Sequence, residues 1–201
     1  MIQSSETDPS VLLTIVGRRV ALGPLRRDLL PLYQRWMNDF EVTRNLAVGS
    51  RPLTLEAEED WYAHASRSST DALFTLYERP NLRPIGTASL HRIDHQHRTA
   101  EFGIVIGERD CWGRGYGTET TARSLEYAFN VLGLHAVHLR VYSGNERGLR
   151  AYTRAGFKVA GRLREAHRYG AEVQDVILMD CLSTEFDRSI LGGSAGDAGT
   201  R

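Results

Sequence analysis

The chain has few of the features that mark secreted, metal-binding or membrane proteins. It contains only two cysteines, Cys111 and Cys181, far apart and in no ligand-like spacing, so we expect neither a disulfide framework nor a zinc site. No apolar run approaches the roughly 20 residues that a membrane helix needs. The polar residues 1–10 lack the basic and apolar regions of a signal peptide. We therefore expect a cytoplasmic protein that does not enter membranes.

The chain also lacks net charge and internal linkers. Its 25 Lys and Arg residues balance 25 Asp and Glu residues, so no global field favours nucleic acid or an anionic membrane as a partner. The 201 residues, 41% of them hydrophobic, suit one soluble globular domain. No Pro/Gly/Ser-rich linker and no repeat interrupts the middle of the chain. We predict a single domain over residues 11–186, with flexible termini at 1–10 and 187–201.

Hydrophobic periodicity predicts a definite order of strands and helices. Residues 11–25 are expected to form strand structure that turns at Gly17, and Asp28 and Thr54 are expected to cap the first two helices. A meander of strands followed by strand–helix–strand units predicts an α/β (α+β) sandwich around a mixed sheet. The other expected strands are 72–78, 84–93, 99–107, 135–142, 159–169 and 173–182, and the later helices are 117–132 and 146–155.

A glycine-rich loop between a predicted strand and a predicted helix carries the clearest chemical signal. Residues 104–120 read IVIGERDCWGRGYGTET, with glycines at 113, 115 and 117. Glycines let the backbone approach a phosphate, and the free N–H groups of a helix's first turn point at negative charge. Thr118 stands where the dinucleotide fingerprint needs glycine, and the lysine of NTPase loops is missing. A different anion site is therefore indicated, with a plain turn as the alternative.

The segment WGRGYGTE, residues 112–119, resembles the acetyl-CoA pyrophosphate loop of the GNAT superfamily, specifically its RimJ/RimL-like branch. The resemblance covers about residues 11–182 and implies N-acetyltransferase activity without a metal. It also implies a mixed, mostly antiparallel central sheet of about seven strands flanked by about four helices. Further segments that resemble the branch, in its order, are 36–39 with 41–44, 58–61, 145–147 with 151–157, and 161–165 with 175–179.

The resemblance implies how acetyl-CoA would be held. Backbone groups of Ile104, Val105 and Ile106 would bind the pantetheine arm as a β-strand would. Asn145 would bond the pantetheine. Arg147, Arg150 and Arg154 suit the solvated face of a short helix, and one or two of them are candidates for the 3′-phosphate. The loop residues expected to contact acetyl-CoA, mainly through their N–H groups at the pyrophosphate, are Trp112, Gly113, Arg114, Gly115, Tyr116, Gly117 and Thr118.

Acetyl transfer needs a neutral amine and a protonated leaving thiolate, which an acid and a base can provide. Glu101 is the predicted base, with an exposed or ion-paired strand residue as the alternative. Tyr152, implied to lie near the thioester sulfur, is the predicted acid, with core packing as the alternative. The candidate contacts of the acceptor are Trp36, Asn38 and Trp61, and simple packing is an equal alternative for the two tryptophans.

The expected function is transfer of an acetyl group from acetyl-CoA to a primary amine, by direct attack in a ternary complex. The acceptor is either a protein N-terminal α-amine or a small amine such as a polyamine, an aminoglycoside or an amino-acid-like molecule. A non-catalytic acyl-CoA-binding sensor is the alternative from another class, and a homodimer is compatible with the branch. No metal is expected at His91, His95 and His97. The neutral chain offers no strong acidic field, which slightly disfavours a polyamine or an aminoglycoside, although a local group of Glu56, Glu58, Glu59 and Asp60 could supply one.

Overall fold

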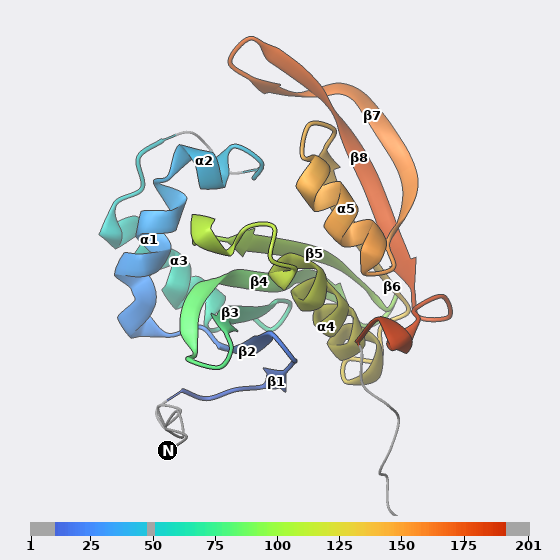
Figure 1. Ribbon diagram of the computed structural model, residues 1–201, viewed down its shortest axis with the longest axis horizontal. Helices are drawn as coiled ribbons and strands as arrows, with labels where there is room; N and C mark the ends of the chain where they lie inside the picture. The colour runs from blue at the N-terminus through green and yellow to red at the C-terminus, as the bar shows by residue number, and fades with distance from the viewer. Residues whose placement is uncertain (1–10, 48–50, 192–201) are drawn as a thin grey trace, which may run out of the picture.

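The computed structural model describes residues 11–47 and 51–191, and its strands form one eight-stranded sheet (Figure 1). The strand order is β1-β2-β3-β4-β5-β6-β8-β7. The strands are β1 (Ile15–Val16), β2 (Val20–Pro24), β3 (Ala72–Glu78), β4 (Arg83–Asp94), β5 (Thr99–Ile106), β6 (Ala136–Tyr142), β7 (Lys158–Tyr169) and β8 (Glu172–Leu182).

Five α-helices and three 3-10 helices complete the described part of the chain. Figure 1 shows α1, α2 and α3 together at one end of the molecule, while α4 and α5 lie farther along the sheet. The helices are α1 (Leu30–Met37), α2 (Phe40–Thr43), α3 (Leu55–Ala65), α4 (Tyr116–Asn130) and α5 (Glu146–Arg154), with η1 (Arg27–Leu29), η2 (Arg109–Cys111) and η3 (Arg188–Leu191). In these ranges no helix combines the length and apolarity that crossing a membrane requires.

The mixed, mostly antiparallel sheet predicted from the sequence is confirmed. Every neighbouring pair of strands is antiparallel except β5 and β6. Those two pair in parallel only from Thr99 with Ala136 to Glu101 with His138. Beyond Glu101 the two strands separate, while β6 stays paired with β8 along its whole length. The central sheet therefore has an opening along the second half of β5.

The two faces of the sheet bury different partners, because successive side chains of a strand point in opposite directions. Phe74, Leu76 and Phe102 belong to the main apolar core, which also includes Leu125 of α4. On the other face Tyr33 of α1 packs in a smaller cluster, against which Val105 is also packed. The Tyr33 hydroxyl lies 2.5 Å from Thr75 Oγ1, which faces opposite to Phe74.

The two predicted helix caps have different outcomes. Thr54 caps α3 as expected, since its hydroxyl accepts the N–H of Ala57 at 3.3 Å. Asp28 does not cap α1: its carboxylate accepts Arg26 Nε at 3.0 Å, and the residue itself lies inside the 3-10 helix η1, with Leu29 at the N-cap of α1. The nearby guanidinium competes successfully for the carboxylate that would otherwise bind backbone N–H groups.

The described part of the chain continues beyond the predicted domain limit at residue 186. Residues 188–191, expected to be flexible, form η3, and Phe186 packs its ring 5.6 Å from that of Phe129 on α4. Apolar contact with α4 therefore continues the packed unit to Leu191. Residues 1–10 and 192–201, also predicted to be flexible, lie outside the described residues.

Candidate active site

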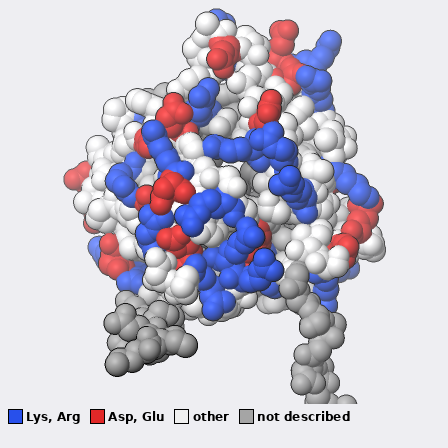
Figure 2. Space-filling model, in the orientation of Figure 1, with Lys and Arg blue, Asp and Glu red and all other residues white. Residues whose placement is uncertain are grey.

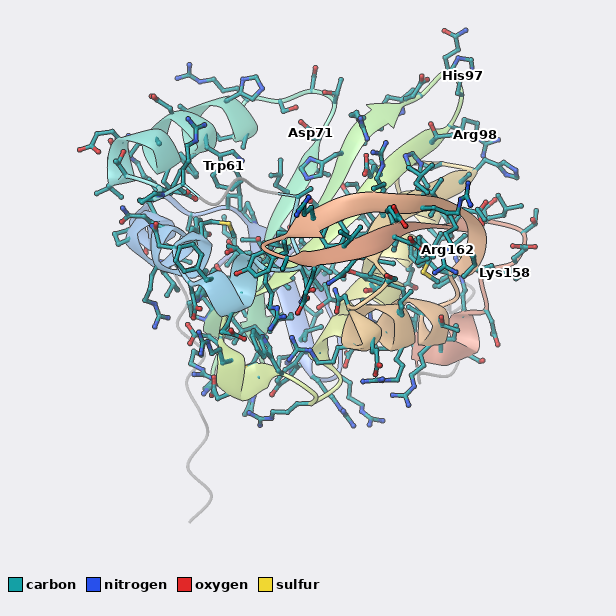
Figure 3. All side chains as sticks on the ribbon, turned by 90° about the horizontal axis from the view of Figure 1, so that it is seen from above. Trp61, Asp71, His97, Arg98, Lys158 and Arg162 are labelled. Atoms are coloured by element: carbon teal, nitrogen blue, oxygen red, sulfur yellow. The ribbon has the colours of Figure 1, made fainter. Side chains whose placement is uncertain are left out.

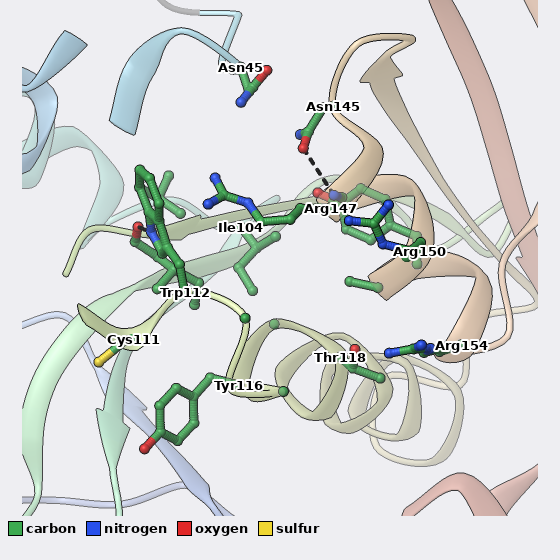
Figure 4. Close-up of a pocket in the computed structure, with 18 of the residues that line it drawn as sticks. Asn45, Ile104, Cys111, Trp112, Tyr116, Thr118, Asn145, Arg147, Arg150 and Arg154 are labelled. Atoms are coloured by element: carbon green, nitrogen blue, oxygen red, sulfur yellow. Dashed lines mark hydrogen bonds between the residues drawn. The ribbon is translucent and has the colours of Figure 1, made fainter. Parts of the chain in front are cut away.

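A cavity of about 360 Å³ lies beside the opening of the sheet (Figure 4). One wall is the second half of β5, and the second is the loop that leads from η2 into α4. The start of α5 and residues 42–46 complete it. Side chains of Ile104, Trp112 and Tyr152 line this space. The three chain segments that carried the resemblance to acetyltransferases are thus brought together.

The backbone of β5 offers hydrogen-bonding groups to the cavity. Gly107 donates its N–H to the Ile85 carbonyl at 2.8 Å, and bonded positions alternate along an antiparallel ladder. Val105 therefore turns its backbone groups toward β4. Ile104 and Ile106 turn theirs toward the other edge, which among the described strands has no partner beyond Glu101.

Trp112 closes one end of this edge. Its Nε1 donates a hydrogen bond of 2.8 Å to the Ile106 carbonyl, in agreement with that carbonyl facing away from β4. Of the three strand residues predicted to bind pantetheine, Ile104 and Ile106 have suitably directed backbone groups. Val105 lines the cavity, but its backbone is directed to β4.

The glycine loop opens α4 as an anion site would require. Gly115 is the N-cap residue, with a φ of 86° in the left-handed region that favours glycine. At Gly117 an added Cβ would meet no protein atom within 4 Å, so the first turn of the helix is open. The free N–H groups of this turn and the helix dipole together attract negative charge. Thr118 also lines the cavity.

Side chains of the loop anchor it on the outside of the cavity. The Tyr116 hydroxyl donates to Glu78 Oε2 at 3.1 Å, and the Arg114 guanidinium lies 4.0 Å from the same oxygen. Arg19 Nη1 donates to the Arg114 carbonyl at 2.9 Å. Any cofactor contact of Arg114 and Tyr116 would therefore involve the backbone, while their side chains position the loop.

The cavity is basic. Arg147, Arg150 and Arg154 of α5 all line it, and Figure 2 shows Lys and Arg side chains gathered near the centre of this face. Burial, with the nearby Arg150, lowers the pKa of Arg147 below its ordinary value. The sequence predicted one or two of these arginines at the 3′-phosphate and the rest on a solvated helix face, whereas all three border the cavity. The helix N-terminus and three arginines fit a polyphosphate ligand.

Asn145 begins α5. Its side-chain Oδ1 accepts the N–H of Gly148 at 2.9 Å, the bond drawn dashed in Figure 4. An added Cβ at Gly148 would lie 2.7 Å from the Asn145 amide nitrogen, so a larger residue there would shift this side chain. The oxygen of Asn145 is thus used as a cap, and the amide nitrogen is the group left for the predicted pantetheine contact.

Tyr152 lies at the inner end of the cavity, against the core. Its ring packs edge-on against Phe102, with centroids 6.3 Å apart. Burial raises the pKa of Tyr152 to about 12. The phenol therefore stays protonated at neutral pH, the form in which it can donate a proton. Packing and the predicted acid role are both compatible with this position.

Glu101 lies at the point where β5 and β6 separate, but it does not line the cavity. Its carboxylate is ion-paired with Arg92 and lies 3.8 Å from Arg140 Nε. An incoming ammonium would therefore compete with these guanidinium groups for the Glu101 carboxylate. The structure thus has the ion-paired arrangement that was the alternative to the base role.

The predicted acceptor contacts do not line the cavity, and each has a packing role. Trp36 is 1% exposed, and its Nε1 donates to Glu108 Oε1 at 2.9 Å. Asn38 binds Leu53 through both ends of its amide, at 2.9 Å each. Trp61 packs its ring edge-on against that of Tyr33. Residues 42–46, missed in the sequence, reach the cavity only through the tertiary fold.

Cys111 offers no reactive thiolate at this cavity, and the described residues contain no metal-binding cluster. The Cys111 thiol is buried, and burial raises its pKa to about 11, which disfavours the reactive thiolate. Among residues 11–47 and 51–191, no group of three or more His, Cys, Asp and Glu side chains is arranged to hold a metal ion.

An opened sheet beside a glycine loop and a basic helix defines a site for a CoA-type cosubstrate. The chain belongs to the Acetyltransferase (GNAT) domain family, whose profile it matches over residues 19–158. It is similar to the spermidine N(1)-acetyltransferase of Vibrio cholerae, with 33% identity over 131 residues that cover 65% of this chain and 74% of the relative.

Another relative and a solved structure to which the chain is similar are also N-acetyltransferases. Human alpha/beta-tubulin-N-acetyltransferase 9 is 29% identical over 156 residues, which cover 72% of this chain and 74% of that protein. The crystal structure of the Vibrio cholerae spermidine N-acetyltransferase in complex with CoA and spermine has a TM-score of 0.77 at 25% identity. The match covers 83% of this chain and 97% of that one.

The protein is an acetyl-CoA-dependent N-acetyltransferase, with acetyl-CoA as its cosubstrate. The predicted fold, enzyme class and cosubstrate are confirmed. The GNAT part of the predicted resemblance is confirmed as well, whereas the relatives do not support its RimJ/RimL-like branch specifically.

Proposed function

We propose that the acceptor is a polyamine of the spermidine class, acetylated at a primary amine. The observation that carries this proposal is the likeness, with a TM-score of 0.77, to nearly the whole chain of an enzyme whose structure holds CoA and spermine. A second relative in the same class, spermidine N(1)-acetyltransferase of Escherichia coli, is 33% identical over 94 residues that cover 47% of this chain and 50% of its own.

The residues that line the cavity support a placement of each part of acetyl-CoA. N–H groups of residues 113–118 would bind the pyrophosphate, and Arg147, Arg150 and Arg154 would neutralise phosphate charge. The open-edge groups of Ile104 and Ile106 would pair with the amide-containing pantetheine arm. In this placement the thioester lies at the inner end of the cavity, near Tyr152.

Acetyl-CoA supplies an activated acetyl group. The acceptor nitrogen must lose a proton before it attacks, since a primary ammonium has no lone pair to offer. Tyr152, protonated because burial raises its pKa to about 12, would donate a proton to the departing sulfur. Glu101, the base predicted from the sequence, is paired with Arg92.

The acidic group on α3 supports a cationic acceptor only in part. Glu56, Glu59 and Asp60 are exposed, whereas Glu58 is 4% exposed and points into the protein. Three exposed carboxylates on one short helix remain able to attract a polycation.

A peptide α-amine is the second candidate acceptor, favoured by the similarity to the tubulin N-acetyltransferase. The predicted RimJ/RimL-like branch, the cytoplasmic location, the homodimer, and the domain limits of 11–186 stay predictions.

An amine panel separates these possibilities. Release of free thiol from acetyl-CoA would be measured with spermidine, spermine, aminoglycosides, amino acids and N-terminal peptides, alongside calorimetric CoA binding. We expect selective turnover of spermidine and spermine. Selective turnover of the peptides would overturn the polyamine proposal in favour of the second candidate. CoA binding without turnover of any amine would favour the acyl-CoA sensor.

A further inference from the structure

Three polar side chains form a chain of contacts on the sheet face opposite α4. Ser89 and His91 are two residues apart on β4 and so share this face. Ser89 Oγ lies 2.6 Å from His91 Nε2, and His91 Nδ1 lies 3.4 Å from Asp71 Oδ1. A hydroxyl, an imidazole and a carboxylate in this order can move a proton from the hydroxyl to the imidazole.

Asp71 is held in place as the last member of this chain. It accepts the Arg92 N–H at 2.9 Å and the Ser68 hydroxyl at 2.8 Å. Burial opposes ionisation, but these hydrogen bonds prevail and hold the pKa of Asp71 below its ordinary value. Figure 3 shows Asp71 at the beginning of β3. An ionised Asp71 favours the His91 tautomer with the proton on Nδ1, which leaves Nε2 to accept from Ser89.

Ser89 stands next to the opening of the sheet. Its ladder partner on β5 is Gly103, where an added Cβ would lie 3.1 Å from Ser89 Oγ. Glycine therefore leaves the hydroxyl uncovered on the side of β5. The next residue, Ile104, lines the cavity from the opposite face of the sheet, and Ser89, His91 and Asp71 are not themselves among the lining residues. Because neighbouring strands are about 5 Å apart, the hydroxyl lies within one strand spacing of the open edge.

The charged groups around His91 leave it as the accessible proton acceptor. Glu101 is its ladder partner on β5 and is ion-paired with Arg92 and Arg140. His138 lies beyond Glu101 on β6. Both Glu101 oxygens are engaged by arginines, whereas the His91 side chain is 43% exposed and can release a proton to water.

We propose that Ser89, His91 and Asp71 form the relay that takes the proton from the acceptor ammonium. This inference rests on the proposed transfer to a primary amine. The ammonium gives a proton to Ser89 Oγ while the Ser89 proton moves to His91 Nε2. A neutral amine and an imidazolium that faces Asp71 result.

The remaining steps balance without another reactant. The amine nitrogen bonds to the acetyl carbonyl carbon, and the carbon–sulfur bond breaks with its electron pair going to sulfur. Sulfur takes the Tyr152 proton, and the phenolate takes a proton from the acetylated nitrogen. The His91 imidazolium finally releases its proton to water, so that the products are amide, free thiol and one proton.

The kinetic test compares pH profiles of kcat/KM for the amine. His91→Gln and Ser89→Ala should each lower the value at pH 7 on the order of 100-fold, the size of a lost general base. The loss should shrink as the pH approaches about 10, where the amine loses its proton unaided. Calorimetric CoA affinity should stay unchanged. The matched control is His97→Gln, an exposed histidine in the turn after β4.

A second readout does not depend on activity. Ring-nitrogen NMR of His91 should show the Nδ1–H tautomer, and Asp71→Asn should reduce its population. An Nε2–H tautomer would overturn the relay, whether or not any amine is turned over. The absence of turnover with every amine would instead defeat the proposed function. Wild-type turnover with unchanged pH profiles in both His91→Gln and Ser89→Ala would overturn the relay alone.

Discussion

The guanidinium carbon of Arg147 lies 4.0 Å from the centroid of the Trp112 indole ring. Through its Nε1 the same indole donates to the Ile106 carbonyl at 2.8 Å. Trp112, the first residue of the glycine loop, therefore links α5 to the open edge of β5. Its two contacts fix the positions of the loop, α5 and β5 relative to one another.

Replacing this indole tests whether the link supports CoA binding. Trp112→Phe keeps an aromatic face for Arg147 but removes the donor to Ile106. A net hydrogen bond contributes about 1 kcal/mol, so we expect CoA affinity about fivefold weaker by calorimetry. The control is Trp61→Phe, an aromatic residue that does not line the cavity. An unchanged affinity in Trp112→Phe would remove Trp112 from the binding site.

Crowding the first turn of α4 tests the pyrophosphate placement. Gly117 has open space where a side chain would lie and does not have a positive φ, so Gly117→Val should clash with ligand alone. We expect CoA affinity to fall roughly tenfold or more, and the melting temperature to change by less than about 2 °C. Gly161→Val on β7, also without a positive φ, is the control. Retained affinity in Gly117→Val would place the pyrophosphate elsewhere.

The acid role of Tyr152 predicts a separation of turnover from binding. Tyr152→Phe should lower kcat on the order of 100-fold with little effect on CoA affinity. Since burial raises its pKa to about 12, wild-type kcat should show no loss from phenol ionisation between pH 8 and 10. The matched control is Tyr127→Phe, because Tyr127 lies on α4 and packs its ring against Phe74 of β3. Equal turnover in Tyr152→Phe and wild type would leave Tyr152 with packing alone.

Glu58 predicts a pH-dependent stability. Burial raises its pKa from 4.5 to about 7, so the native state keeps a proton that the unfolded state has lost. The stabilisation is fully present below pH 4.5 and disappears as the pH rises through 7. It amounts to up to about 3 kcal/mol. Glu58→Gln should flatten the fall in unfolding free energy between pH 5 and 8, measured by chemical denaturation.

The control for this prediction is Glu59→Gln, an exposed carboxylate on the same helix. It should leave the pH dependence as in the wild type. If Glu58→Gln and Glu59→Gln both follow the wild-type curve, the Glu58 carboxylate is ionised in the native state at neutral pH without cost.

Glu119 connects the glycine loop to the N-terminal hairpin. Its carboxylate accepts the backbone N–H groups of Arg18 and Arg19, at 3.1 Å for Arg19. Hydrogen bonds to a charged group contribute more than neutral ones, so Glu119→Ala should lower the unfolding free energy by about 2 kcal/mol. Glu146→Ala, which removes an exposed pair with Arg150, should cost about 0.5 kcal/mol or less. Similar losses in both variants would contradict the prediction.

Most elements could be predicted from the sequence because their signals are local. The strand predicted at 99–107 is β5, Thr99–Ile106, and the helix predicted at 146–155 is α5, Glu146–Arg154. Alternation of side chains and a glycine after the helix depend only on neighbours within a few residues. Asp28 shows that two local signals can compete, since a guanidinium two residues away takes the carboxylate expected to cap α1.

The candidate site was predictable in its segments and not in its contacts. The glycine loop, the β5 edge and the start of α5 were all expected, and the structure places them around one cavity. Glu101 was placed on the correct strand, yet Arg92 and Arg140 reach it from the two neighbouring strands. Those pairings depend on sheet register, which no short stretch of sequence specifies.

By itself the sequence determined the chemistry that the backbone can offer. Gly115 permits a left-handed turn at the start of α4, and alternating apolar residues define the two faces of β5, because both properties belong to single residues and their neighbours. Only the tertiary structure decided that β5 and β6 separate after Glu101, and that Asp71 meets His91 beside Ser89. Such meetings between distant segments result from packing of the whole sheet, whose register is set by long-range burial of its two faces.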